Sequence, residues 1–179
     1  VFQVVFLAGA HDIGKLPPAF AVQVPALRDE MVLAGLPMPA EIPWTERRRM
    51  PHSLAGQVLL GEWLQERHRW GRGEVGGLAS VVGGHHGIPP SATELNGASG
   101  PRAAPGGATP LGALLGTGPW ERVQAEILDH VAARAGADAY LRGAAWRSLP
   151  PPVLALALGV VVVADWLASN DALFPLTPV

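Results

Sequence analysis

The chain has 179 residues, a length that suits one domain and allows it to bury a substantial core. Hydrophobic residues make up 49% of the sequence and charged residues only 16%, so the composition excludes an intrinsically disordered chain. The formal net charge of -2 gives no overall attraction to nucleic acid or to an acidic membrane, so any affinity for phosphate has to come from a local site.

The first predicted element is a buried helix over residues 1–10, which ends just before His11. Its apolar run lacks the basic region of a signal peptide and is too short to span a bilayer. Because no initiator Met precedes it, we expect this run to be the tail of a truncated N-terminal helix. Pro17 and Pro18 stop any continuation, and residues 21–50 are predicted to be irregular because further prolines interrupt them.

The next predicted helix begins after Pro51 and ends near Trp70, because apolar residues recur there at helical spacing. Residues 77–86 give a short apolar helix that leads into a pair of adjacent histidines. Residues 87–118 are rich in Gly, Pro, Ala and Ser, which predicts a long mobile surface loop without structure of its own.

Pro119 fits the first turn of a further helix, which ends at Gly136, and a short helix is predicted over 138–147. After three consecutive prolines, the most apolar stretch of the chain runs from Val153 to Ala164. An aspartate follows directly, which favours a central core helix over a membrane span. Since strand patterns are scarce, the sequence predicts an all-α class, as a single helical bundle with one long Gly/Pro-rich surface loop.

Four pieces of the sequence carry residue types that bind metals. They are His11-Asp12, His52, His85-His86 and Asp165. Each histidine piece also has an ordinary interpretation, as a helix cap, a solvated side chain or an exposed turn. Asp165 is the most informative piece, because an uncompensated carboxylate in an apolar helix costs several kcal/mol. A bound metal would offset this cost, and so would a hydroxyl or a backbone donor.

The absence of cysteine excludes disulfides and thiolate metal sites, and it favours a reducing compartment. Four histidines and two aspartates suit Mn, Fe, Co, Ni or Zn better than Mg, which prefers oxygen ligands. Six ligands exceed what one metal with open positions uses, so we predict two metal ions roughly 3.5–4 Å apart with Asp12 bridging them. Such a pair activates a water and stabilises the attacking and leaving oxygens of a phosphodiester.

Two further residues are expected beside this centre. Lys15 is the only lysine in a chain whose other basic residues are all arginine, which indicates a place that needs a compact, strongly hydrated ammonium. Ser169 lies one helical turn after Asp165, so the two share a face. We predict that Lys15 and Ser169 bind phosphate oxygens or hold the metal ligands in position.

Residues 1–90 and 153–178 resemble the HD superfamily of metal-dependent phosphohydrolases. More narrowly, they resemble the HD nuclease domain of the CRISPR-associated type I helicase–nuclease. Four strings in this order carry the resemblance: Ala-His-Asp-Ile-Gly-Lys-Leu-Pro-Pro-Ala-Phe at 10–20, Pro-His-Ser-Leu at 51–54, Gly-His-His-Gly-Ile-Pro-Pro at 84–90 and Ala-Asp-Trp-Leu-Ala-Ser-Asn at 164–170.

The resemblance implies that residues 1–179 form one mostly helical nuclease domain with a two-metal centre that cuts single-stranded DNA. It implies that a linker beginning at 171–179 leads to a helicase region, in the same protein or in a partner, which uses ATP to feed DNA to this domain. An RNA-guided surveillance complex would recruit both in the cytoplasm, as part of antiviral defence and without a membrane. By position, the resemblance assigns His11, Asp12 and Asp165 to the first metal and Asp12, His52, His85 and His86 to the second, with Asp12 and Lys15 in catalytic roles.

The family has another histidine on an earlier helix, which completes the first metal site, and nothing before His11 can supply it here. The first metal site is therefore expected to be incomplete in this chain. Of the two remaining imidazoles, His68 is predicted to be exposed and His130 to flank the apolar face of its helix. Two other functions stay open: an HD phosphohydrolase acting on free nucleotides, and a catalytically inactive docking module.

A run of three arginines, residues 47–49, precedes His52. Such a run is suited to follow a DNA backbone, and a solvated loop is an equal alternative. Most of the tryptophans are predicted to pack in the core, whereas Trp44 beside the arginine run is placed to stack on a base.

Overall fold

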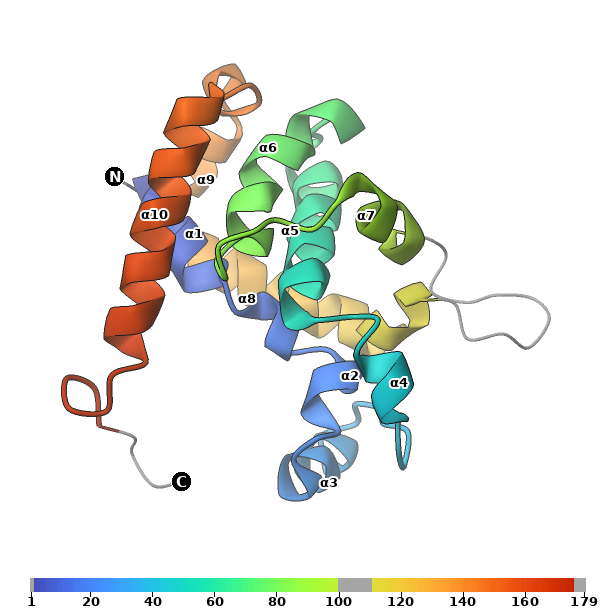
Figure 1. Cartoon of the computed structure of the whole chain (residues 1–179). Helices are drawn as coiled ribbons and strands as arrows, with labels where there is room; N and C mark the ends of the chain where they lie inside the picture. The colour runs from blue at the N-terminus through green and yellow to red at the C-terminus, as the bar shows by residue number, and fades with distance from the viewer. Residues whose placement is uncertain (1, 100–110, 176–179) are drawn as a thin grey trace.

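The computed structural model describes residues 2–99 and 111–175, and every regular element in these two ranges is a helix. The predicted all-α class is therefore confirmed. Figure 1 shows the helices gathered around α5 (His52–His68), with α6 (Arg72–Gly83) beside it and α10 (Pro151–Ala168) along one side of the bundle. Three other elements also contact α5, namely the short 3-10 helix η1 (Ile13–Lys15), α7 (Ala92–Ala98) and α8 (Pro119–Arg134).

The central helix α5 begins where the sequence predicted, directly after Pro51, and ends two residues before Trp70. At its end Arg69 adopts a left-handed conformation with a φ of 59°, and the amide of Trp70 donates to the carbonyl of Leu64. Most α5 side chains are buried, and complete burial of a leucine such as Leu64 contributes about 1.5–3 kcal/mol. This burial anchors His52, the first residue of α5, at the edge of the core.

Helix α1 (Phe2–Ala10) brings the His-Asp pair to the same edge. It contacts α6, α8 and α10, and its side chains Phe6 and Leu7 are fully buried. Because α1 ends at Ala10, as predicted, His11 is the first residue after a helix that the core holds in place.

Helix α10 is not the central core helix that the sequence predicted. It contacts α1 and α6 along one face, and among its residues only Ala157 and Val161 are buried. Its other face exposes large apolar side chains, with Leu156 at 73% and Trp166 at 71% exposure. By length and composition alone α10 could cross a bilayer, and only 11% of it is buried among the described residues. The prediction failed because α10 is apolar on all sides, so its sequence does not indicate which face the rest of the chain covers.

Residues 21–50, which the sequence predicted to be irregular, contain helices. Prolines stand at the starts of α3 (Pro25–Leu33) and α4 (Trp44–Arg47), where a fixed φ and a missing N–H favour a helix rather than break it. The preceding short helix α2 (Pro18–Ala21) begins in the same way. The prediction failed because a proline interrupts a helix only in its interior.

The predicted surface loop over 87–118 is also partly helical. Helix α7 begins with a capping box, in which Ser91 and Glu94 exchange hydrogen bonds, and the 3-10 helix η2 (Leu111–Leu115) buries Leu115. Residues 100–110 of this loop lie outside the described residues. Two short elements follow α8, namely α9 (Asp138–Leu141) and η3 (Ala144–Trp146), within the range predicted to hold one short helix.

Three of the six tryptophans are buried and connect segments that are distant in sequence, whereas Trp166 is 71% exposed, so the prediction that most of them pack in the core holds only in part. The indole N–H of Trp63 donates to the carboxylate of Asp129 over 3.0 Å. The indole N–H of Trp70 donates to the Leu141 carbonyl over 2.8 Å, and that of Trp120 donates to the Pro37 carbonyl over 2.8 Å. His68, which was predicted to be exposed, is buried and packs edge-on against Trp63 at 4.6 Å between ring centroids. That prediction was wrong because the charged neighbours of His68 in sequence lie on other, exposed faces of α5.

Candidate metal centre

The structure gathers the six predicted ligand residues into two adjacent groups. The first group joins the end of α1 to the last turns of α10. His11 Nε2 lies 3.2 Å from Asp165 Oδ1 and 3.3 Å from Asp12 Oδ2. His11 Nδ1 donates to the carbonyl of Ala8 over 2.7 Å, which orients the ring so that Nε2 faces the two carboxylates. A hydrogen bond to Asp12 raises the pKa of His11 to about 9, so a cation at Nε2 would compete with a proton.

The second group is made of imidazoles from α5 and from the loop after α6. His52 Nε2 lies 3.2 Å from His85 Nε2 and 2.7 Å from His86 Nε2. His85 Nδ1 donates to the carbonyl of Val82 over 2.5 Å, so its Nε2 carries the free lone pair. Burial, together with the neighbouring His85 and His86 rings, lowers the pKa of His52 to about 4, and burial also lowers the pKa of His85. Near pH 7 these two rings are therefore neutral, the form that binds metals.

Asp12 lies between the two groups. Its Oδ2 faces His11 and accepts a 2.6 Å hydrogen bond from Lys15 Nζ, while its Oδ1 lies 3.8 Å from His52 Nε2 and 3.9 Å from His85 Nε2. Burial raises the pKa of Asp12, but hydrogen bonds from His11 and Lys15 outweigh burial and hold this pKa well below its usual range. One ionised carboxylate therefore faces both groups, which is the arrangement expected of a bridging ligand.

The donor set of each group fits a divalent transition metal. In each group three side chains offer one ligand atom apiece, and these atoms lie within 4.8 Å of one another. Two nitrogen ligands at the usual metal–nitrogen distance of about 2.0–2.1 Å stand roughly 3 Å apart, close to the Nε2 separations from His52. Three Nε2 atoms converge in the second group, and at least one of them carries only a lone pair and can only accept. Such an arrangement needs a shared proton or a cation between the nitrogen atoms.

Lys15 and Ser169 each contact one of the candidate ligands. The Lys15 side chain is 44% exposed, so its ammonium reaches both Asp12 and the space in front of the centre. Ser169 Oγ donates to Asp165 Oδ1 over 3.1 Å, from one turn further along the same face of the chain. Asp165 is only partly buried, with 19% of its side chain exposed, because α10 is peripheral. Its carboxylate accepts from Ser169 and lies against His11. Asp165 is therefore not the isolated buried charge that its apolar neighbours in sequence predicted.

Three glycines that sequence analysis did not single out bring these elements together. A Cβ added to Gly14 would lie 1.8 Å from the carbonyl oxygen of His52 and 2.6 Å from the amide of Gly56. Likewise, a Cβ on Gly56 would approach a methyl of Val82 to 3.1 Å, and one on Gly83 would overlap the side chain of Gln57. The backbones of η1, α5 and α6 can therefore approach closely enough to converge their histidines. Only Gly14, inside the His-Asp-Ile-Gly-Lys segment, offered a signal for this in the sequence.

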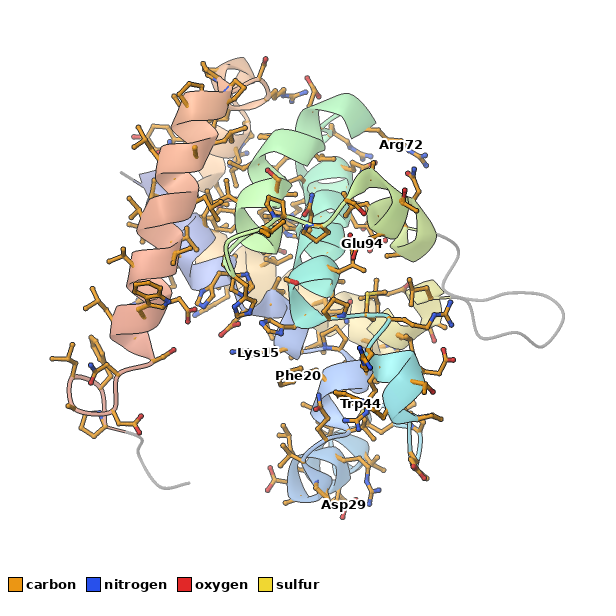
Figure 2. The ribbon with its side chains drawn as sticks, in the orientation of Figure 1. Lys15, Phe20, Asp29, Trp44, Arg72 and Glu94 are labelled. Atoms are coloured by element: carbon orange, nitrogen blue, oxygen red, sulfur yellow. The ribbon has the colours of Figure 1, made fainter. Side chains whose placement is uncertain are left out.

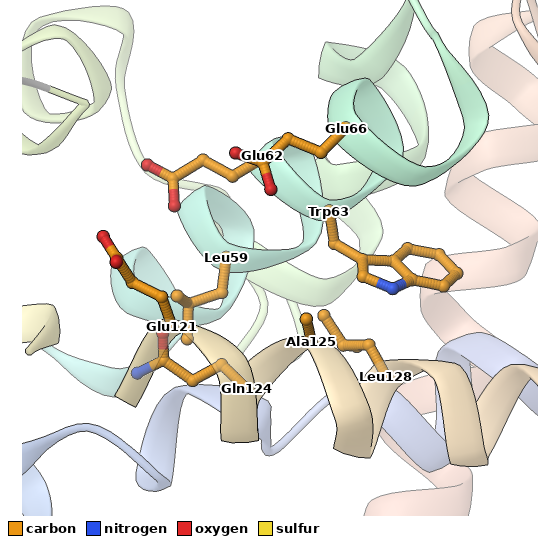
Figure 3. A pocket seen from close by; sticks show the side chains of 8 residues that line it. All are labelled: Leu59, Glu62, Trp63, Glu66, Glu121, Gln124, Ala125 and Leu128. Carbon is orange, nitrogen blue, oxygen red and sulfur yellow. The ribbon is translucent and has the colours of Figure 1, made fainter. Parts of the chain in front are cut away.

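A separate groove of about 320 Å³ lies between α5 and α8. Figure 3 shows the carboxylates of Glu62, Glu66 and Glu121 along its edges, with apolar side chains such as Leu59 and Leu128 nearby. None of the six predicted ligand residues lines this groove. The six predicted ligand residues therefore lie elsewhere, at the junction of α1, α5, α6 and α10.

A helical bundle that presents a His-Asp pair beside three further histidines and a distant aspartate is a domain of the HD superfamily. The family model described as "Cas3, HD domain" matches residues 3–174, and the chain belongs to this family. The resemblance found in the sequence is thereby confirmed.

Two curated relatives match nearly the whole chain. The CRISPR-associated nuclease/helicase Cas3 of Streptococcus thermophilus is 26% identical over 182 residues, covering 96% of this chain and 18% of the relative. The CRISPR-associated endonuclease/helicase Cas3 of Thermus thermophilus is 28% identical over 169 residues, covering 94% of this chain and 16% of the relative. The chain thus spans less than a fifth of the length of these relatives.

Solved structures agree with the fold. A crystal structure of a CRISPR-associated protein has a TM-score of 0.68 and 29% identity, covering 97% of this chain and 17% of the other. The Thermus thermophilus Cas3 HD domain, crystallised in the presence of Ni²⁺, has a TM-score of 0.58 and 24% identity, covering 97% of this chain and 56% of the other. The second structure supports the helical architecture alone.

Proposed function

We propose that this chain is a metal-dependent nuclease domain that hydrolyses the phosphodiester bonds of single-stranded DNA. The observation that carries the proposal is the position of Asp12, whose two oxygens face two separate groups of ligand atoms. A pair of divalent transition metal ions, Mn, Fe, Co, Ni or Zn, would supply Lewis acidity toward the attacking and leaving oxygens of the phosphate. His11, Asp12 and Asp165 would hold one ion, and Asp12 with His52, His85 and His86 the other.

The chain's own residues position the phosphodiester. Asp12 is kept ionised by its donors and would be the ligand shared by both groups. Lys15 presents a half-exposed ammonium next to Asp12, where it would neutralise charge on a non-bridging phosphate oxygen. Ser169 holds Asp165 through its hydroxyl and so fixes the carboxylate that α10 contributes.

The names of the two relatives support the proposal that this activity belongs to a larger assembly. Both are nuclease/helicase proteins, which supports a helicase region beyond 171–179 in the same protein or in a partner. We propose that this region uses ATP to feed DNA to residues 1–179, within the interference step of a type I CRISPR system. An RNA-guided surveillance complex would direct both to their target in the cytoplasm, with no role for a membrane.

Turnover with added Mn²⁺, Co²⁺ or Ni²⁺ tests the proposal, with single-stranded DNA set against deoxynucleoside triphosphates and cyclic nucleotides. We expect cleavage of the single strand, loss of cleavage with a chelator, and loss in Asp12→Ala. Preference for the small substrates would identify a nucleotide phosphohydrolase instead. Absence of bound metal, together with no activity after an N-terminal helix is added back, would identify a docking module that keeps only the fold.

A further inference from the structure

A groove of about 250 Å³ opens directly beside the second group of histidines. His52 is one of its lining residues, and the other walls come mainly from α2, α4 and the residues between α4 and α5. Aromatic and cationic side chains line it together, notably Phe20, Trp44, Arg47 and Arg48. In Figure 2, Lys15, Phe20 and Trp44 follow one another along one part of the molecule, with Arg72 at the far end.

The cations of this groove are available to an anion. Within the described residues neither Arg47 nor Arg48 has a carboxylate partner, whereas Arg49 is paired with Glu46 at 2.8 Å. The Nε of Arg47 is buried and lacks a hydrogen-bond partner among the same residues. Two guanidinium groups without a carboxylate partner therefore line this groove, in a chain whose net charge is -2.

The aromatic side chains are available for stacking. Trp44 is 61% exposed, although a tryptophan at a structural position is normally buried. The Arg47 and Arg48 guanidinium carbons lie 5.5 and 5.6 Å from its ring centroid, so the exposed indole and the two cations form one cluster. Phe20 stands edge-on to the His52 ring at 5.8 Å, so the aromatic surface continues up to a candidate metal ligand.

We propose that this groove binds the single strand next to the bond to be cut, with a base stacked on Trp44 and backbone phosphates on Arg47 and Arg48. The proposal rests on the proposed function, since it extends the path of the substrate away from the two groups of ligands. Alternation of an exposed indole with guanidinium groups is the combination that binds unpaired nucleotides without reading their sequence. A duplex does not offer its base faces to such a surface, so we infer selectivity for single strands.

Binding to a labelled oligothymidylate of about ten nucleotides tests the groove, at a length typical of single-strand binding sites. The 179-residue chain is used with a chelator, so that affinity is measured without cleavage, by fluorescence anisotropy. We expect Trp44→Ala to weaken binding by about tenfold, as loss of one stacked base does, with Trp44→Phe close to wild type. Circular dichroism and thermal unfolding verify that each variant is folded.

Salt dependence separates the two kinds of contact. Arg48→Ala should lower the slope of log K against log salt by about 0.7, the value for one phosphate contact on a single strand. Trp44→Ala should leave this slope unchanged. Arg72→Ala is the matched control, because it removes the same charge at the far end of the molecule (Figure 2). Wild-type affinity in Trp44→Ala, an equal effect of Arg72→Ala, or equally tight duplex binding would each overturn the proposal.

A small phosphodiester separates this proposal from the proposed function. Bis(4-nitrophenyl) phosphate needs the metal centre but is too small to depend on the groove. With Mn²⁺ added, Trp44→Ala and Arg48→Ala should raise the KM for single-stranded DNA far more than the KM for this small ester. If the wild type binds the oligonucleotide through Trp44 but hydrolyses neither substrate, the nuclease proposal fails and the groove stands.

Discussion

Lys15 Nζ lies 2.6 Å from Asp12 Oδ2, on the side of the carboxylate that also faces His11. The ammonium therefore stabilises the ionised carboxylate and at the same time repels any cation that this oxygen would bind. A residue retained only to hold a metal would not bring a positive charge to the metal's own ligand. The arrangement is better explained by a second anion, the phosphate, arriving at the same place.

Lys15→Ala should consequently change metal affinity and turnover in opposite directions. Loss of the repulsion is expected to tighten Mn²⁺ binding severalfold in isothermal titration calorimetry. Turnover of bis(4-nitrophenyl) phosphate is expected to fall about 100- to 1,000-fold, the usual range for loss of a group that stabilises transition-state charge. Lys15→Arg keeps the charge but not the compact ammonium, so it should restore only part of the turnover. Weaker metal binding in Lys15→Ala would instead make Lys15 a support for the metal ligands.

The two groups of ligands should differ in metal affinity. The second group offers three imidazoles plus Asp12, whereas the first offers one imidazole, whose pKa of about 9 favours a proton, and two carboxylates. We expect His86→Ala to lose the tightly bound Co²⁺ or Ni²⁺, and Asp165→Ala to keep it and lose only the weaker ion. Equilibrium dialysis with metal analysis counts the ions, and added metal should raise the Tm only where a site remains.

His130→Ala is the matched control for these metal counts. His130 is an exposed histidine on α8, outside both groups of ligand atoms. Its removal should change neither the number of bound ions nor the metal-dependent rise in Tm. If His130→Ala lost an ion, His130 would belong to the ligand set and the assignment of ligands from the sequence would be wrong.

The candidate ligands could be proposed from the sequence because residue type and order alone indicate which side chains are able to bind a metal. His11-Asp12, His85-His86 and Asp165 each stand out without any knowledge of packing. What the sequence could not show is which oxygen of Asp12 faces which group, since this depends on how α1, α5 and α6 approach one another. The close backbone contact at Gly14 decides that approach, and a single glycine in a short motif does not indicate what it packs against.

Burial was predicted less well than chemistry. Helix α10 is apolar on every side, so no periodicity indicated that only Ala157 and Val161 would be covered. His68 has charged neighbours in sequence, yet on a helix adjacent residues point to different faces, and its own face meets Trp63. In both cases the missing information was tertiary contact, which local pattern does not contain.

Gly14→Ala should damage the metal centre more than the fold away from it. A Cβ at this position would overlap the carbonyl oxygen of His52, which is backbone and cannot rotate aside. We expect loss of several kcal/mol of unfolding free energy, in the range of severe overpacking, and weaker Co²⁺ binding in optical titrations. Gly76→Ala is the control, since its Cβ meets nothing within 4 Å; in the middle of α6 it should stabilise the chain by about 0.5–1 kcal/mol. Equal effects of the two substitutions would remove the close contact at Gly14 from the explanation of the site.

The buried imidazole of His68 should make the fold sensitive to mild acid. Burial lowers the pKa of His68 below its usual 6.5, and its Nε2 has no hydrogen-bond partner among the described residues. The folded state therefore binds fewer protons at this ring than the unfolded state does, so stability rises with pH in this range. This contribution is fully present above about pH 6.5 and is lost progressively as the pH falls below it.

His68→Phe keeps a ring against Trp63 but cannot titrate, so it isolates this effect. Between pH 7 and pH 5.5 the variant should lose less unfolding free energy than the wild type in urea titrations with a chelator present. His52 and His85, whose pKa values are also lowered, titrate in both proteins and cancel in the comparison. An identical loss in the two proteins would mean that His68 gains a partner on protonation, for which the carboxylate of Asp138, 4.0 Å from its Nε2, is the nearest available group.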